Sequence, residues 1–465
     1  MKRRDFLTST AAAFAVSGGA LAFGTTGGFA AANPARLKMP PLVDTRSSGR
    51  LAMVAQAGST NFLGGTSVPT AGYSQGYLGP TMLMQNGALA TEIGNTLDEP
   101  VSVHWHGMKI DGAQDGGPHQ PVRPRKTWAP EMQINQNPAT IWYHSHIHER
   151  TAEQVYSGLA GVIHITDGRD DDRGLPSTYG IDDLTLVLQD RQFDGEGRMV
   201  YELSMMDRMN GFHGNRMLIN GQSGAVAAVP KGIVRLRLLN GSNARIYSLF
   251  FNDSRPMHLV ATDGGFLPEP IALDVLQLAP GERAEILVDF SGGGAPILMS
   301  DPDQSFGVLE FATDDTLASR IERIPDRFDA TLEDLAGTEV RTQNISLDMG
   351  MGMMMGGGFS INGEAFDMDR INFDVALGSV ERWIIRSSMV AHPFHVHGVQ
   401  FRVLSEDGRS PKPENSGWKD TVLVPGESEI IARFDHPASK ETPFMFHCHI
   451  LEHEDAGMMG QFTVS

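Results

Sequence analysis

The stretch HCHILEHEDAGMM, residues His447–Met459, lies near the C-terminus and contains the single cysteine of the chain. On an extended strand, successive side chains point to opposite faces. Cys448 would therefore face one side of the strand, and His447 and His449 the other. The stretch predicts one strand that contacts two metal sites, through a thiolate on one face and two imidazoles on the other.

A further histidine and a methionine follow the cysteine. His453 comes five residues after Cys448, and Met458 comes five residues after His453. One thiolate, two imidazoles and a weakly bound thioether are the ligands of a blue-copper electron-transfer site. The second histidine of such a site must come from elsewhere in the chain. A small buried structural cysteine is the competing interpretation, so the remaining sequence has to decide.

Length and composition indicate a large all-β chain. Its 465 residues suggest about three domains of ~150 residues each. The 52 glycines and 26 prolines predict many turns, as in all-β proteins. The net charge of -19 argues against nucleic acid or an anionic membrane surface as a partner and is compatible with cationic substrates such as metal ions.

The N-terminus has the pattern of an export signal. Arg3 and Arg4 are followed by Phe-Leu and by a mildly apolar run from Ala11 to Phe23. We expect residues 1–32 to be a twin-arginine signal peptide that directs the protein to the periplasm. A disordered basic N-terminus is the alternative. No later apolar run is long enough to span a membrane.

Short alternating segments between Gly, Pro and Asn turns divide the remaining chain into β-sandwich units. We expect three such units, at residues 44–167, 181–313 and 340–465. The first and third each contain a His-x-His-Gly segment and then a second His-x-His strand, which is an internal repeat. The middle unit has His213 and His258 but no such pair, so we interpret it as a copper-free spacer.

Ten of the sixteen histidines fall into four clusters at strand spacing: His104 and His106; His144 and His146; His392, His395 and His397; His447, His449 and His453. A single histidine is often a hydrogen-bonded core residue. Four clusters of this kind favour a metal centre over ten unrelated structural histidines.

The segments HWHG (104–107), HSH (144–146), HPFHVHG (392–398) and HCHILEHEDAGMM (447–459) resemble the four copper motifs of the multicopper oxidases, the family of laccases, ferroxidases and bacterial copper-efflux oxidases. The resemblance covers essentially the whole mature chain. It implies an all-β fold of three cupredoxin-like Greek-key β-sandwich domains in tandem, and four copper ions.

The same resemblance implies which residue binds which copper. The type 1 copper would be bound by His392, Cys448 and His453, with Met458 axial. The type 2 copper would be bound by His104 and His395. The type 3 pair would be bound by His106, His144, His146, His397, His447 and His449. Electrons would enter at the type 1 site and pass through Cys448 to the trinuclear site, where O₂ is reduced to water.

Reduction of O₂ to water also requires protons, so carboxylates are expected near the cluster. Asp115, nine residues after His106, and Glu454, next to His453, resemble the acids that serve the family in this way. The alternative for Asp115 is a turn residue before two glycines.

The reductant is suggested by a methionine-rich segment, residues 349–355. Thioethers are soft ligands that prefer Cu(I), and the segment resembles a shortened form of the insert over the type 1 site of copper-efflux oxidases. Candidate ligands for a substrate copper are Asp348, Met349, Met351, Met353, Met354, Met355 and Met389. In those oxidases an acid and a methionine precede the HPFH motif, whereas this chain has Ser388 and Val390 in their places. A flexible linker with incidental methionines is the competing interpretation.

The sequence therefore predicts a monomeric periplasmic oxidase that oxidises Cu(I), with laccase-like activity on phenols. A general laccase or a ferroxidase, with an organic or Fe(II) donor, is the nearest alternative. A copper nitrite reductase leaves the third unit unexplained. A copper-buffering protein would not need the Cys448 strand. A copper-free structural relative with a cell-envelope role should have lost ligands, and this chain retains all ten histidines, Cys448 and Met458.

Overall fold

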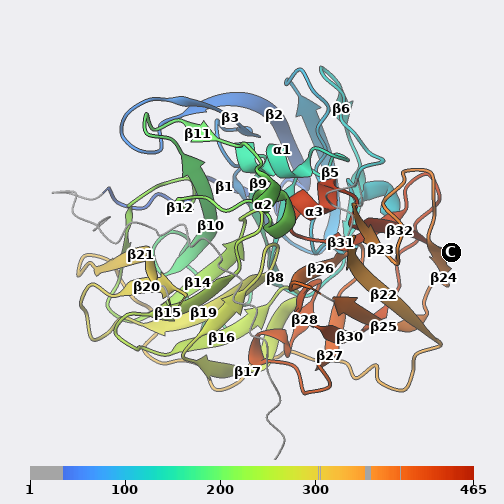
Figure 1. The fold of residues 1–465 in the computed structure, drawn as a ribbon. Helices are drawn as coiled ribbons and strands as arrows, with labels where there is room; N and C mark the ends of the chain where they lie inside the picture. Colours follow the sequence, from blue (N-terminus) through green and yellow to red (C-terminus); the bar gives the residue numbers. More distant parts are fainter. Residues whose placement is uncertain (1–34, 302, 304, 351–357, 388) are drawn as a thin grey trace, which may run out of the picture.

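Figure 1 shows a computed structural model of the chain, which describes residues 35–301, 303, 305–350, 358–387 and 389–465. These residues form six β-sheets, and each of three successive parts of the chain contributes two. The prediction of an all-β fold is confirmed. The sheets of the first part lie at the top of Figure 1 in blue and cyan, those of the second at the lower left in green and yellow, and those of the third at the right in brown and red.

The first unit pairs a four-stranded sheet with a five-stranded one. The four-stranded sheet has the order β1 (Leu42–Asp44), β4 (Thr81–Met84), β9 (Ala160–Ile165) and β8 (Ala139–His144). The other has the order β3 (Val68–Tyr73), β2 (Arg50–Thr60), β5 (Gly87–Asn95) and β6 (Thr127–Trp128), with β7 (Glu131–Ile134) also on β5. Along β2, Leu51, Met53 and Ala55 are buried at every second position, because alternate side chains face the core.

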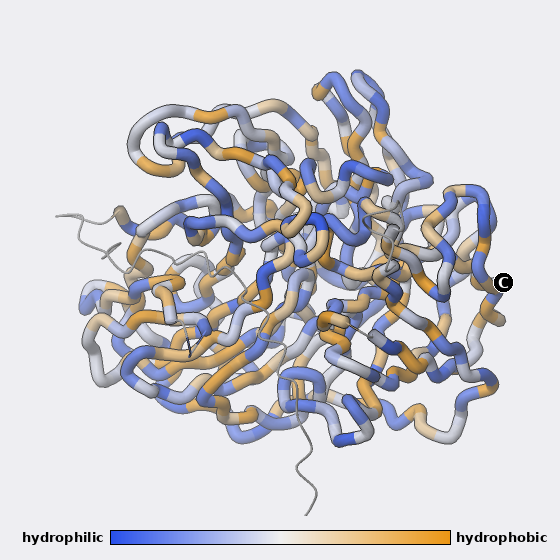
Figure 2. The backbone as a smooth tube through the Cα atoms, viewed as in Figure 1, coloured by the Kyte–Doolittle hydropathy of each residue, from blue (hydrophilic) through white to orange (hydrophobic). Residues whose placement is uncertain are grey.

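The middle unit contains the most extended sheet, with the order β11 (Met199–Val200), β10 (Asp183–Phe193), β14 (Ile233–Asn240), β19 (Arg283–Asp289), β16 (Met257–Thr262) and β17 (Gly265–Leu273), and β12 (Arg216–Ile219) on β10. The facing sheet has the order β13 (Val226–Val229), β21 (Phe306–Thr313), β20 (Ile297–Ser300), β15 (Tyr247–Phe251) and β18 (Leu276–Leu278). Figure 2 shows apolar residues along the strands of this unit.

The third unit repeats the arrangement. One sheet has the order β23 (Phe359–Ile361), β22 (Arg341–Met349), β25 (Val380–Ser387), β30 (Glu427–Arg433), β27 (Phe401–Glu406) and β28 (Trp418–Lys419). The other has the order β24 (Phe373–Val375), β32 (Met459–Val464), β31 (Phe444–Cys448), β26 (His392–Val396) and β29 (Thr421–Val424).

Each unit has its own hydrophobic core, built mainly from the facing sides of its two sheets. The boundaries 44–167, 181–313 and 340–465 remain our proposal for where the domains begin and end. Three short helices lie close together near the middle of the molecule: α1 (Thr151–Ser157), α2 (Met205–Asn210) and α3 (Leu451–Asp455), and α3 contacts both others (Figure 1).

Within the described residues, no helix is long and apolar enough to cross a membrane. The predicted signal peptide, residues 1–32, lies outside them, as do Met351, Met353, Met354 and Met355 of the methionine-rich segment.

Candidate copper centre

Strand β31 brings Cys448 and His447 to different groups of side chains. In the antiparallel pairing of β31 with β26, Cys448 lies opposite Phe394, and His447 lies opposite His395. Cys448 packs into the hydrophobic core of the third unit. His447 lies on the other side, where its Nε2 is 3.3 Å from Nε2 of His146. This separation follows from the alternation of side chains along a strand.

The first group consists of His392, Cys448 and His453. Nδ1 of His392 lies 3.3 Å from Sγ of Cys448 and 3.3 Å from Nδ1 of His453. Nδ1 of His453 lies 3.8 Å from the same sulfur. Met458 is buried beside them, and its backbone carbonyl oxygen accepts a hydrogen bond from the N–H of Cys448. None of these four side chains is exposed to solvent.

Burial sets the protonation of this group. It lowers the pKa of His392 to about 4 and, together with the nearby His392, that of His453 to about 3. Both imidazoles are therefore neutral and each has one ring nitrogen with a lone pair. Burial also raises the pKa of the Cys448 thiol. A bound cation would favour the thiolate, and this donor set fits copper.

The second group consists of eight buried imidazoles from the first and third units: His104, His106, His144, His146, His395, His397, His447 and His449. Nε2 of His104 lies 3.4 Å from Nε2 of His395, and Nε2 of His397 lies 3.3 Å from Nε2 of His447. Burial is the main cause that lowers the pKa of six of them: His106, His144, His146, His395, His397 and His449.

The outer ring nitrogens of this group mostly face protein acceptors. Nδ1 lies within 3.1 Å of a backbone or carboxylate oxygen in five of the rings, His104, His144, His395, His397 and His447. In His144, His395 and His397, whose pKa is lowered by burial, the ring is neutral, so its one hydrogen lies on Nδ1 and the lone pair lies on Nε2. Lone pairs that converge without hydrogens between them are what a copper cluster requires.

His106 is oriented the other way round. Its Nε2 lies 3.0 Å from Oδ1 of Asp420, while its buried Nδ1 has no hydrogen-bond partner among the described residues. His449 has neither nitrogen hydrogen-bonded within the same part of the chain, and its ring centroid is 5.0 Å from that of His106 and 5.6 Å from that of His144. The rings of His106, His144 and His449 thus lie together at this end of the group.

The two predicted acids lie directly against this group. Oδ2 of Asp115 is 2.8 Å from Nδ1 of His397 and 3.4 Å from Nδ1 of His104. The two carboxylate oxygens of Glu454 are 3.3 Å from Nδ1 of His146 and 3.1 Å from Nδ1 of His447. Both side chains are buried.

The predicted substrate-copper residues that the structure describes have different surroundings. The carboxylate of Asp348 accepts hydrogen bonds from Oγ of Ser346 at 2.7 Å and from the N–H of Gly363 at 2.9 Å. Met349 packs against the core of the third unit. Met389 is 64% exposed.

Helix α2 of the middle unit and Asp420 of the third unit also contact the two groups, and neither was predicted from the sequence. Helix α2 contacts the first group through Met209, whose carbonyl oxygen accepts a hydrogen bond from Nε2 of His453 at 3.0 Å, and Met205 and Met206 lie on the same helix. Three methionines within five positions were a visible signal. Asp420 contacts two histidines of the second group, and no sequence pattern marked it.

Comparison with known proteins agrees with this geometry. Models of the multicopper oxidase family match residues 54–170, 175–295 and 335–465. The chain is 41% identical to the solved laccase-like multicopper oxidase CueO of Ochrobactrum sp., with a TM-score of 0.88 over 92% of this chain and 100% of that one. It is 31% identical to the multicopper oxidase McoA of Aquifex aeolicus, with a TM-score of 0.84 over 93% of this chain and 100% of that one.

The curated relatives carry another name. The chain is 36% identical to the cell division protein FtsP of Escherichia coli (strain K12) over 483 residues, which cover 100% of this chain and 99% of that protein. FtsP of Salmonella typhimurium (strain LT2) is also 36% identical, over 100% of this chain and 98% of that protein.

This protein belongs to the multicopper oxidase family. The resemblance seen in the sequence is thus confirmed, and so are the three cupredoxin-like domains in tandem. Membership implies copper as cofactor, and the histidine clusters are present in the structure.

Proposed function

We propose that this protein is a four-copper oxidase that takes single electrons from a reductant and reduces O₂ to two waters, with Cu(I) as its main reductant and phenols as further ones. One observation carries the proposal. A complete family ligand set of ten histidines, Cys448 and Met458 is buried, and it forms one cysteine-containing group and one group of eight imidazoles.

In this proposal each residue keeps the role that the family motifs assign. His392, Cys448, His453 and Met458 hold the type 1 copper, and His104 and His395 the type 2 copper. The type 3 pair is held by six residues: His106, His144, His146, His397, His447 and His449. The coppers supply one-electron transfer and O₂ reduction, and the chain supplies geometry, a dry environment and access.

Asp115 and Glu454 serve as the proton-handling groups. Each carboxylate lies within 3.3 Å of an outer ring nitrogen of the eight-histidine group, so it can hold a proton beside the site without occupying a ligand position. Both side chains are buried, so a proton that reaches the site passes through groups of the chain, and these two carboxylates lie next to its outer ring nitrogens.

Access to the type 1 site supports a soft, small reductant. The four ligand side chains are fully buried, so a reductant cannot touch them and must transfer its electron through the residues that cover them. His453 hydrogen-bonds to the carbonyl oxygen of Met209 on α2, where Met205 and Met206 are 56% and 60% exposed. Exposed thioethers on the helix that contacts His453 suit Cu(I), and the net charge of -19 favours a cation.

A cell-division role without oxidase activity is the second candidate, because relatives named cell division protein FtsP align over the whole chain at 36% identity. The intact ligand set favours the oxidase. Laccase-like oxidation of organic donors has support from the Ochrobactrum protein, which is described as active towards lignin model compounds and lignosulfonate. We further propose export by the twin-arginine route to the periplasm, and a monomer.

Two measurements test the proposal. The first is the copper content of protein loaded with copper and dialysed. About four coppers per chain are expected for the oxidase, and a value near zero overturns it in favour of a metal-free role. The second is oxygen uptake with Cu(I) or a phenol as the sole reductant.

The same assay is run on a variant that lacks residues 349–355 and on one of full length in which the segment's methionines are replaced by serine. Fast uptake with Cu(I) that falls in both variants supports Cu(I) oxidation with this segment as a docking site. Uptake with phenols but little with Cu(I), unchanged in both variants, overturns Cu(I) as the reductant and leaves a laccase.

A further inference from the structure

The middle unit, which supplies no copper ligand, reaches the eight-histidine group through Arg283, the first residue of β19. The guanidinium donates to both carboxylate oxygens of Asp420, from Nη1 to Oδ1 at 2.7 Å and from Nη2 to Oδ2 at 2.5 Å. Neither side chain is exposed. A bidentate ion pair of this kind fixes the plane of the carboxylate as well as its position.

Asp420 in turn contacts two histidines that are assigned to different coppers. Its Oδ1 lies 3.0 Å from Nε2 of His106, and its backbone oxygen lies 2.8 Å from Nδ1 of His395. His106 belongs to the first unit and His395 to the third. One residue therefore orients a ligand from each side of the interface between those units.

The contact with Asp420 decides which nitrogen of His106 is free. An imidazole that binds a metal is neutral and carries one N–H. A carboxylate oxygen at Nε2 places that hydrogen on Nε2 and leaves the lone pair on Nδ1, whose position has no hydrogen-bond partner in the described part of the chain. Oγ1 of Thr421 lies 3.1 Å from the same Nε2, so loss of the carboxylate removes one of the two polar partners that favour this tautomer and ring orientation.

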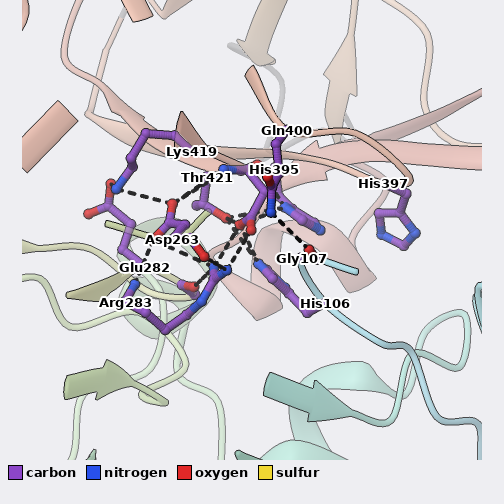
Figure 3. Close-up of polar contacts among 12 residues, drawn as sticks. His106, Gly107, Asp263, Glu282, Arg283, His395, His397, Gln400, Lys419 and Thr421 are labelled. Atoms are coloured by element: carbon purple, nitrogen blue, oxygen red, sulfur yellow. Dashed lines mark hydrogen bonds and ion pairs between the residues drawn. The ribbon is translucent and has the colours of Figure 1, made fainter. Parts of the chain in front are cut away.

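Further contacts hold Arg283 itself in place. Its backbone N–H donates to Oδ1 of Asp263 at 2.8 Å, and Nζ of Lys419 bridges Asp263 and Glu282 at 3.1 and 3.0 Å (Figure 3). The network thus joins three ionisable side chains of the middle unit (Asp263, Glu282 and Arg283) to two of the third unit (Lys419 and Asp420), all of them buried.

Gly107, directly after His106, leaves room for this arrangement. A Cβ at this position would lie 2.5 Å from Oδ2 of Asp420 and 2.6 Å from Nη2 of Arg283. The backbone of Gly107 also has a φ of +89°, a region that favours glycine. The chain next to the ligand is therefore shaped to let the Arg283–Asp420 pair approach.

We propose that Arg283 is a positioning residue for the trinuclear copper site, acting through Asp420 on His106 and His395. The middle unit then has a function beyond separating the other two: it sets the orientation of ligands for the type 2 copper and one type 3 copper. The inference rests on the proposed copper oxidase. It leaves the type 1 group independent of Arg283, since within the described residues neither Arg283 nor Asp420 is hydrogen-bonded to that group.

The test compares Arg283→Lys and Asp420→Asn with Arg237→Lys. Arg237 is the matched control, because it is a buried arginine of the same sheet with a bidentate bond to Asp183, and within the described residues it makes no hydrogen bond or ion pair with a histidine ligand. Each copper-loaded protein is examined for copper per chain, for the blue absorption of the type 1 copper, and for the type 2 resonance and type 3 absorption.

We expect Arg283→Lys and Asp420→Asn to weaken copper binding at the trinuclear site by about 10–100-fold, a typical effect of removing a partner of a metal-bound histidine. The type 1 absorption should stay near the wild-type value. Arg237→Lys should keep all three signals. If Arg283→Lys does not fold, Asp420→Asn, which preserves side-chain shape, decides the question.

Two results would overturn the inference. In one, the type 2 and type 3 signals of the folded variants equal those of the wild type. In the other, all signals fall together and to the same degree as in Arg237→Lys, which would make Arg283 a stabilising ion-pair residue only. Failure of the proposed function itself is distinguishable, because the wild-type protein would then bind no copper.

Discussion

Gly281 of the middle unit lies against the imidazole of His449, so closely that an added Cβ would be 2.9 Å from Cδ2 and 3.0 Å from Nε2 of that ring. The φ of Gly281 is +84°. The proposed type 3 ligand is therefore backed by a backbone that has no room for a side chain. With Arg283 two residues later, the loop before β19 forms part of the wall of the site.

Gly281→Ala is expected to disturb His449 more than it disturbs the fold. The left-handed backbone should cost on the order of 1–3 kcal/mol in the free energy of unfolding, and the methyl group should displace the ring. We expect loss of type 3 absorption with type 1 absorption retained, measured on copper-loaded protein.

Gly293→Ala is the control for this prediction. Gly293 has a φ of +70°, but its added Cβ would be no closer than 3.6 Å to its neighbours. It should show a similar backbone cost and normal copper signals. Equal loss of type 3 absorption in both variants would mean that the effect arises from general destabilisation.

Replacement of Met205 and Met206 by leucine tests α2 as the place where Cu(I) docks. Leucine preserves apolar volume but lacks the soft sulfur. If each of the two thioethers contributes ~1 kcal/mol to binding, KM for Cu(I) should rise by roughly thirtyfold, while the oxidation of a phenol should change little. Steady-state oxygen uptake with each reductant measures both.

Met389→Leu is the comparison for the α2 variant, because Met389 is similarly exposed at 64% and precedes His392 in the sequence. A rise in KM for Cu(I) in Met389→Leu alone would place docking beside that motif instead of α2. No change in either variant would exclude both positions.

The fold and the two ligand groups could be predicted because the patterns that indicate them lie within short stretches of sequence. The alternation along β31 separates Cys448 from His447 whatever the rest of the chain does. The strand β26 pairs with it, so that His395 lies opposite His447. Histidines two positions apart on a strand therefore lie on the same face of that strand, as predicted.

The surroundings of the ligands could not be predicted in this way, because they depend on contacts between units. Arg283 and Asp420 are 137 positions apart, and His106 and Asp420 are 314 apart. Neither residue stands in a pattern that distinguishes it from an ordinary charged surface residue. Only the packing of three units against each other shows that both are buried.

Glu454→Gln should slow turnover without removing copper. The carboxylate lies against Nδ1 of His146 and of His447, and an amide cannot release a proton there. Loss of a proton-transfer group typically lowers the rate by about 10²–10⁴-fold. We expect such a fall in oxygen uptake at normal copper content and normal type 1 absorption.

Glu452→Gln provides the contrast on the same helix. Glu452 is also buried, but it accepts hydrogen bonds from Tyr201 and Asn243 at 2.8 Å and from the N–H of Phe212 at 3.0 Å. Its replacement should lower the melting temperature and leave turnover nearly unchanged. A larger loss of turnover in this variant than in Glu454→Gln would contradict the assignment of the proton-handling acid.

Glu282 should make the stability of the protein depend on pH. Burial raises the pKa of this carboxyl from its ordinary 4.5 to about 7. The positive charge of Lys419 lowers the pKa, and the negative charge of Asp263 raises it. The folded state therefore binds the proton more tightly than the unfolded state. The resulting stabilisation is fully present below pH 4.5 and is lost as the pH rises through about 7.

Glu282→Gln removes this dependence, because glutamine resembles the protonated carboxyl and its oxygen can still accept from the N–H of Ala279. We expect the variant to gain stability over the wild type as the pH rises from 4.5 to 8, by roughly 2–3 kcal/mol in total. Denaturant unfolding of both copper-loaded proteins across this range measures the difference. A difference that stays constant with pH would show that Glu282 is ionised throughout, held by Lys419 despite its burial.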